Sequence, residues 1–203
     1  MSVKPILFNT EMVRAILDGR KSCTRRLVKF LSGENSKWTG YIKDGVMLYN
    51  GKNEPCIRTQ TYQPGDILYV RETWMDYAGR TMYRADCDKY RLESLKLAEF
   101  SWKPSIHMSK EAARIWLKVT DVRVERLQEI TEDGAKTEGA IDNRGFIHSP
   151  ENEYDRIHTA REYFIEIWDS TIKKSDLDFY GWNANPYVWV IEFERCEKPG
   201  SEV

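Results

Sequence analysis

The segment Gly19-Arg20-Lys21-Ser22-Cys23-Thr24-Arg25-Arg26 carries four basic side chains, two hydroxyls and one thiol within eight residues. An amphipathic pattern over 11–18 precedes it and predicts a short helix, with Thr10 as the expected N-cap and the glycine as the stop. Lys21 and Thr24 should therefore lie in a turn just past a helix end. Residues three apart on a strand face opposite ways, so only a bent segment would aim both side chains at one place.

The composition indicates a globular protein. The chain has 203 residues, of which 41% are hydrophobic, and its net charge is −1. No apolar run approaches the length of a membrane span, and the N-terminus lacks a signal-peptide layout, so we expect a cytoplasmic protein without a membrane partner. The near-zero charge excludes a wholesale polyanion binder. Residues 14–29 nevertheless carry six Lys/Arg against one Asp, which indicates either a phosphate-binding patch or a solvated surface.

The four cysteines are scattered and include no Cys-x-x-Cys pair, so we expect reduced thiols. A zinc site formed by Cys23, Cys87 and His107 is an alternative that their spacing supports only weakly, and we expect neither a metal nor a cofactor. His107 has the chemistry of a general base near neutral pH, although a loop histidine bonded to the backbone is the commoner arrangement.

A second informative segment starts at the turn Pro64-Gly65-Asp66 and continues as a predicted strand over 67–74. Alternation places Glu72 on the same face as the apolar Leu68 and Val70. A carboxylate on such a face must be neutral, ion-paired or hydrogen-bonded, because its unpaired burial is costly. The alternative register turns Glu72 toward solvent at the strand end, and the pattern alone does not choose between the two.

The remaining elements are predicted from hydrophobic periodicity and turn residues. An Asp-Gly pair predicts a hairpin formed by 38–41 and 46–49. A long strand over 115–124 should contain a bulge near 120–121, because the alternation changes phase there. Further expected elements are a short strand over 81–85, a mostly irregular segment with a helical turn or two over 86–100, a short helix opening at 131 and ending by Gly139, a long helix over 153–172 with a core-packing stripe, and a central last strand over 187–194.

Strands and helices without regular βαβ alternation indicate an α+β fold built on a small curved sheet or barrel. The length favours a single domain, which we place at 1–196. Insertions are expected near 32–62 and 86–112, and a disordered tail over 197–203.

The chain resembles a known family at two motifs. Residues 19–26 have the spacing Gly-x-Lys-x-x-x-x-Arg, which resembles the signature of ASCH domains. The turn at 64–66, followed by the strand that carries Glu72, resembles the second motif of the same family. The resemblance implies a PUA-like fold, a small β-barrel or strongly curved sheet with flanking helices. The pattern of the whole chain, including 102–108 and 181–195, is similar to larger ASCH-like proteins of phages and prophages.

The residue at position 24 refines the resemblance. ASCH domains usually carry Glu there, whereas Thr24 resembles the small bacterial ASCH enzymes that hydrolyse N4-acetylcytidine. Their proposed catalytic Lys, Thr and Glu correspond to Lys21, Thr24 and Glu72. The resemblance thus implies an amidohydrolase acting on an N-acylated cytidine or related modified nucleoside, with Thr24 as nucleophile, Lys21 as base and Glu72 as acid/base.

This chemistry requires a depressed pKa for Lys21, from burial or from neighbouring cations. A direct ion pair with Glu72 would raise that pKa, so Glu72 must be protonated or separated from Lys21 by substrate. Further residues expected to bind substrate or phosphate are Arg20, Arg25, Arg26, Arg71, Trp74 and His107.

Three other interpretations remain open at this level. The chain could be an RNA-binding ASCH module that uses its basic patch and exposed aromatic rings without catalysis. It could be a ribonuclease that uses the same cleft. Finally, Lys21 and Glu72 could form a structural ion pair, with Thr24 only capping the turn.

Overall fold

The computed structural model describes residues 2–30, 41–43, 47–49, 52, 54–57, 62–97, 100–142 and 159–200. The chain divides into two compact units, each assembled from segments distant in sequence. Unit 1 comprises Met1–Arg20, Pro64–Thr120 and Phe193–Val203, and unit 2 comprises Lys21–Gln63 and Asp121–Glu192. Within the described ranges, no helix is long and apolar enough to span a bilayer.

The main sheet has five strands in the order β1-β5-β8-β9-β2. These strands are β1 (Val3–Leu7), β2 (Cys23–Leu27), β5 (Ile67–Arg71), β8 (Trp116–Arg126) and β9 (Tyr187–Cys196). β1 pairs with β5 in parallel, β5 with β8 in antiparallel orientation, and β2 with β9 in antiparallel orientation. The predicted α+β class and the central position of the last strand are confirmed. No pairing joins β1 to β2 in the described part of the chain, so these strands form an open sheet.

Two hairpins accompany the sheet. β3 (Tyr41–Lys43) and β4 (Met47–Tyr49) form the predicted hairpin, but β3 begins at the last residue of the predicted first strand, 38–41. Residues 38–40 and 44–46 lie outside the described residues. β6 (Trp74–Tyr77) and β7 (Arg80–Tyr83) form the second hairpin. The single strand predicted over 67–74 was wrong at its end, because β5 stops at Arg71 and β6 starts a new pairing at Trp74.

The helices of unit 1 begin with α1 (Thr10–Leu17), which buries Val13, Ala15 and Ile16. Its N-cap is Asn9 rather than the predicted Thr10, because Asn9 Oδ1 accepts a hydrogen bond from the backbone N–H of Met12 at 2.8 Å. Gly19 ends the helix as predicted, with φ of +74° in the left-handed region.

The segment predicted as mostly irregular contains a regular helix. η1 (Arg84–Asp86) leads into α2 (Lys89–Leu97), a nine-residue helix, and η2 (Ser105–His107) follows. These elements lie in the predicted insertion near 86–112. The predicted tail over 197–203 is described only as far as residue 200.

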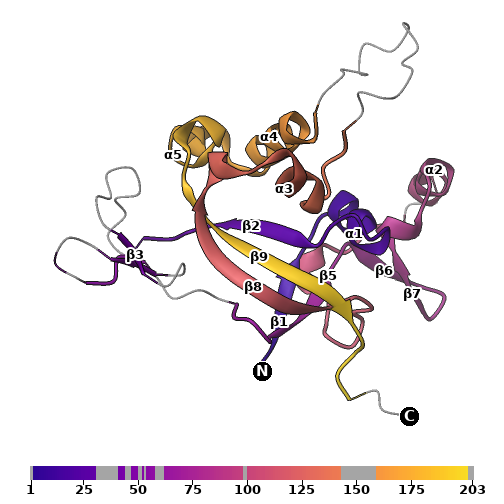
Figure 1. Cartoon of the computed structure of the whole chain (residues 1–203). Coiled ribbons are helices and arrows are strands. Elements are labelled where there is room, and N and C mark those ends of the chain that lie inside the picture. Colours follow the sequence, from indigo (N-terminus) through magenta and orange to yellow (C-terminus); the bar gives the residue numbers. More distant parts are fainter. Residues whose placement is uncertain are drawn as a thin grey trace, which may run out of the picture. The chain divides into compact units, whose positions relative to one another are not determined.

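In unit 2, α3 (Glu132–Thr137), α4 (Ala160–Thr171) and α5 (Leu177–Tyr180) lie on one side of β2 and β9 (Figure 1). Short 3-10 turns join them: η3 (Leu127–Glu129), η4 (Lys174–Asp176) and η5 (Trp182–Ala184). The core between helices and strands contains Cys23, Phe164, Trp168, Val188 and Val190. The stripe predicted on the long helix therefore packs in the core.

The start of α4 is held from several sides. Thr159 and Glu162 form a capping box, and the Glu132 carboxylate of α3 accepts hydrogen bonds from the backbone N–H groups of Ala160 (2.8 Å) and Arg161 (3.2 Å). The Arg161 guanidinium also stacks over the ring of Trp182, 4.7 Å from its centroid. The helix predicted from 153 is described only from 160, since 153–158 lie outside the described residues.

The long strand β8 changes its buried face in mid-course. Leu117 and Val119 are buried, and so are Val122 and Val124, one position out of phase. This is the phase change predicted from the sequence. The boundary between the two units falls at the same place, after Thr120.

Candidate functional site

Six polar or charged side chains are buried in the described part of the chain: Lys21, Thr24, Arg25, Asp66, Glu72 and Glu138. Burying charge is costly unless each group finds a partner, so such side chains mark either structural braces or sites. Four of the six belong to unit 2. We call Lys21, Thr24, Arg25, Glu138 and the half-buried Glu125 the β2 cluster.

Lys21 lies just before β2, where it forms an isolated β-bridge with Glu138. Its ammonium donates to Glu138 Oε2 at 2.7 Å, to the Glu138 carbonyl at 2.8 Å and to the Cys23 carbonyl at 2.7 Å. All three ammonium protons can be used in this way. The carboxylate partner of Lys21 is therefore Glu138, which the sequence analysis did not single out.

Burial lowers the pKa of Lys21, because the charged amine loses its hydration. The charge and hydrogen bond of Glu138 oppose this effect, and the charge of Arg26 adds to it. The direction of the pKa shift is the one that a general base requires.

Arg25 shares Glu138 with Lys21. Its Nη1 lies 3.3 Å from Glu138 Oε1 and its Nη2 lies 3.3 Å from Glu125 Oε2. The Arg25 Nε is buried and has no hydrogen-bond partner among the described residues. An unpaired buried N–H is unusual in a folded protein and costs stability.

Thr24 faces away from Arg25, because successive side chains of β2 alternate. The Thr24 side chain is buried, and its hydroxyl makes no hydrogen bond to another described residue. Its neighbour Cys23 packs in the core of unit 2, where burial, assisted by the charge of Glu138, raises the pKa of the thiol to about 12. The Cys23 thiol is therefore neutral and unreactive near pH 7.

Glu72 belongs to unit 1 and is buried, so the apolar-face register predicted as one alternative is the one observed. Arg114 donates to its carboxylate through Nε (2.9 Å) and Nη2 (3.1 Å), and to Asp86 through Nη1 (2.7 Å) and Nη2 (2.8 Å). The guanidinium covers the ring of Tyr83 at 3.9 Å. We call Glu72, Arg114, Asp86 and Tyr83 the Glu72 clamp.

Opposing effects act on the pKa of Glu72. Burial, the largest effect, raises it, and the charge of Asp86 adds to the rise, whereas the hydrogen bonds and charge of Arg114 lower it. Glu72 is thus ion-paired with Arg114, and Lys21 is ion-paired with Glu138.

The other residues expected to bind substrate lie in varied surroundings. Arg20 is exposed and pairs with Asp18 at 2.9 Å, and Arg26 is exposed on β2. In unit 1, Arg71 donates through Nε to the Met108 carbonyl at 2.7 Å. Of these six residues, only Arg25 belongs to the β2 cluster.

Trp74 and His107 complete that set. Lys103 lies over the Trp74 ring, 4.5 Å from its centroid, and Trp74 Nε1 is buried without a partner among the described residues. His107 is exposed at the end of η2. For the alternative zinc site, Cys23 belongs to unit 2, whereas Cys87 and His107 belong to unit 1. The described residues contain no group of three or more His, Cys, Asp or Glu arranged to hold a metal ion.

Sequence reasoning missed Glu138 and Arg114 because both partners are remote. Glu138 is 117 residues from Lys21, and Arg114 is 42 residues from Glu72. No spacing rule connects such pairs. The only available signal was the general one that a buried charge needs a partner.

Comparisons with known proteins find two distant structural similarities and no match in sequence. No protein-family model and no curated protein matches the sequence. An ASCH domain from Lactobacillus crispatus has a similar crystal structure, with 12% identity and a TM-score of 0.45, covering 96% of this chain and 79% of that one. A protein described only as hypothetical is similar at 13% identity and a TM-score of 0.39, covering 97% and 100%. Neither similarity bears on site residues or activity.

Proposed function

We propose that the β2 cluster is the catalytic centre of an amidohydrolase acting on an N-acylated cytidine or a related modified nucleoside. The observation that carries the proposal is a buried lysine with a lowered pKa, three positions before a buried threonine whose hydroxyl has no partner among the described residues. Perturbed pKa values in buried polar clusters are typical of functional sites. The choice of a cytidine amide rests on the motif resemblance of Lys21, Thr24 and Glu72.

In this mechanism Thr24 Oγ1 attacks the acyl carbonyl and its proton passes to neutral Lys21. Neutral Lys21 forms when its ammonium gives a proton to Glu138 Oε2, which lies 2.7 Å away. No hydrogen bond joins Thr24 to Lys21, so this proton transfer requires a bridging water or a movement of the two side chains. The C–N bond then breaks, and the departing exocyclic nitrogen takes a proton. Water hydrolyses the acyl-threonine ester, which releases the carboxylic acid and restores Thr24.

For Glu72, which belongs to unit 1, the acid/base role rests on the motif resemblance alone. The rise of its pKa on burial is compatible with this role, because it favours the protonated form. Its two hydrogen bonds from Arg114 oppose the role, because they favour the carboxylate. Glu72→Gln therefore tests the third member of the set separately from the first two.

Acid release from N4-acetylcytidine and a panel of other acylated nucleosides, followed by chromatography, tests the proposal. We expect Thr24→Val to lower kcat/KM by about 10³-fold or more, because the nucleophile is lost, and Lys21→Met by about 10²- to 10⁴-fold. Ser22→Ala is the matched control for the hydroxyl and Lys29→Met for the charge, since both side chains are exposed and outside the cluster. Both controls should keep wild-type activity.

Failure of the folded wild-type chain to hydrolyse any acylated nucleoside would overturn the proposal. Binding of RNA that weakens steeply with salt, without turnover, would then identify a binding module. Cleavage of RNA, lost in the same variants, would identify a ribonuclease.

A further inference from the structure

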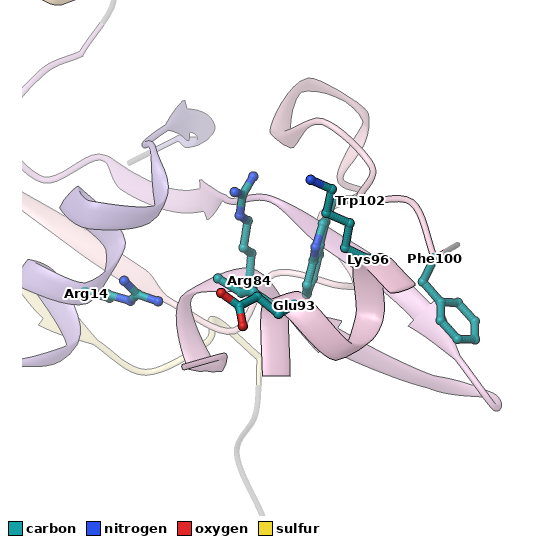
Figure 2. A pocket seen from close by; sticks show the side chains of 7 residues that line it. Arg14, Arg84, Glu93, Lys96, Phe100 and Trp102 are labelled. Carbon is teal, nitrogen blue, oxygen red and sulfur yellow. The ribbon is translucent and has the colours of Figure 1, made fainter. Parts of the chain in front are cut away.

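Unit 1 contains a pocket of about 400 Å³ that involves none of the residues in the proposed mechanism. Its lining includes Arg14, Arg84, Glu93, Lys96, Phe100 and Trp102, drawn in Figure 2. These residues come from α1, η1, α2 and the segment after α2. A volume of this size is in the range of small-molecule sites.

The pocket is positively charged. Its lining has three cations against one carboxylate, Glu93. Arg14 is committed to the fold, because its guanidinium donates to the carbonyls of Ala85 (3.0 Å) and Cys87 (2.7 Å) and pairs with Glu11 (2.9 Å). Arg14 therefore supplies one wall and part of the charge.

Arg84 and Lys96 are the cations available to a ligand. Both side chains are exposed, and neither makes a hydrogen bond or ion pair with another described residue. Figure 2 shows them extending in the same direction from η1 and α2. Two uncommitted cations on one concave surface favour an anion, and an arginine fork with a lysine suits a phosphate group.

Trp102 supplies a flat apolar surface beside these cations. The half-buried indole packs against the buried cluster of Met75, Cys87 and Leu95, which holds the ring in place. In the view of Figure 2 the indole lies between Arg84 and Lys96, whereas Phe100 points away from them. Aromatic rings beside cations are the usual platform for a nucleobase.

We propose that this pocket binds a nucleotide unit, with its phosphate on Arg84 and Lys96 and its base stacked on Trp102. Glu93 accepts a hydrogen bond from an amino group of the base. A free mononucleotide and one nucleotide of a single-stranded RNA both present a phosphate and a base, so either could be the ligand. The inference stands independently of the amidohydrolase mechanism, since the two share no residue.

Calorimetric titration of the full chain tests the proposal with CMP, AMP, cytidine, inorganic phosphate and a single-stranded RNA pentamer. We expect nucleotide binding, competition by phosphate, and at least about tenfold weaker binding of the nucleoside, which lacks the phosphate contacts. Pentamer binding much tighter than CMP or AMP identifies the strand as the ligand. Equal affinities identify the free nucleotide.

The Arg84→Ala, Lys96→Ala double variant should weaken nucleotide binding at least about tenfold and stay folded, because both side chains are exposed. Arg91→Ala is the matched control, since Arg91 is exposed on the same helix and is not part of the lining. Its affinity should equal that of the wild type. Absence of binding by the folded chain, or equal affinities of the wild type and the double variant, would overturn the proposal.

Discussion

The β2 cluster and the Glu72 clamp both bury charged side chains, but the charge of the shared group differs. The shared group is a carboxylate in the β2 cluster and a cation in the clamp. In the β2 cluster one carboxylate, Glu138, serves two cations, Lys21 and Arg25, whose side chains are 1% and 4% exposed. In the clamp one cation, Arg114, serves two carboxylates, Glu72 and Asp86. The Arg114 side chain is 26% exposed and that of Asp86 50% exposed, so the clamp reaches solvent.

The two regions also differ in whether their buried polar atoms all have hydrogen-bond partners. Arg114 matches its planar fork to both carboxylates, an arrangement that stabilises a fold. The β2 cluster leaves the buried Arg25 Nε without a partner among the described residues, and burial lowers the pKa of Lys21. Unsatisfied buried groups are costly and call for a functional explanation. The β2 cluster therefore has more of the features of a reactive centre than the clamp, in which Arg114 already holds the Glu72 carboxylate.

Removing the shared carboxylate should have the largest effect. Glu138→Ala leaves the buried Lys21 without its carboxylate and Arg25 with only the half-buried Glu125, so we expect the free energy of unfolding to fall by about 3–5 kcal/mol. Urea denaturation measures the change. The control Glu194→Ala removes an exposed pair with Lys118 at 3.9 Å and should change stability by less than about 0.5 kcal/mol. Similar losses for the two variants would contradict the deep burial of the β2 cluster.

Breaking the clamp should cost less, because Arg114 is partly exposed. Arg114→Met should lower the free energy of unfolding by about 2 kcal/mol at pH 7, since Glu72 stays buried without its cation. In this variant the folded-state pKa of Glu72 rises further above the ordinary 4.5. The folded state then binds more protons than the unfolded state, so stability recovers as pH falls through the folded-state pKa toward 4.5.

The double variant Arg114→Met, Glu72→Gln supplies the control for this pH dependence. It has no titrating group at position 72, so its stability relative to Glu72→Gln should not change between pH 5 and pH 8. A pH-dependent difference of the same size in both backgrounds would assign the effect to another group.

The smallest effect concerns the thiols beside the two regions. Cys23 and Cys87 are buried, whereas Cys56 and Cys196 are half-buried. The rise of the Cys23 pKa from 9.0 to about 12 lowers its thiolate fraction at pH 8 about a thousandfold. Reaction with a disulfide reagent should therefore have a fast phase from Cys56 and Cys196, and Cys23→Ser should leave that phase unchanged. One uniform phase for all four thiols would contradict the burial of Cys23.

Much of the fold could be predicted from local patterns. The alternation around Glu72, the phase change in β8 and the glycine stop after α1 each depend on residues within a few positions of one another. Asn9 was missed as a cap because Asn and Thr both cap helices and the two are adjacent. β1 was missed because Pro5 interrupts its short apolar run, although proline is tolerated in a strand at the end of a sheet.

The partners within the candidate site could not be predicted in the same way. Thr24 and Lys21 are recognisable in a motif, but the burial that lowers the pKa of Lys21, and the Glu138 carboxylate that opposes this shift, depend on packing against a remote part of the chain. Pairing across 117 residues follows from how the strands and helices pack, which no local pattern records. Burial, partner and protonation state were therefore available only from the structure.

The anchoring of the first turn of α4 has a practical consequence for protein engineering. Its backbone N–H groups are satisfied by Thr159 and by the Glu132 carboxylate from α3, so the start of α4 depends on a residue of another helix. Any redesign of α4 should therefore keep Glu132, although this residue lies on α3.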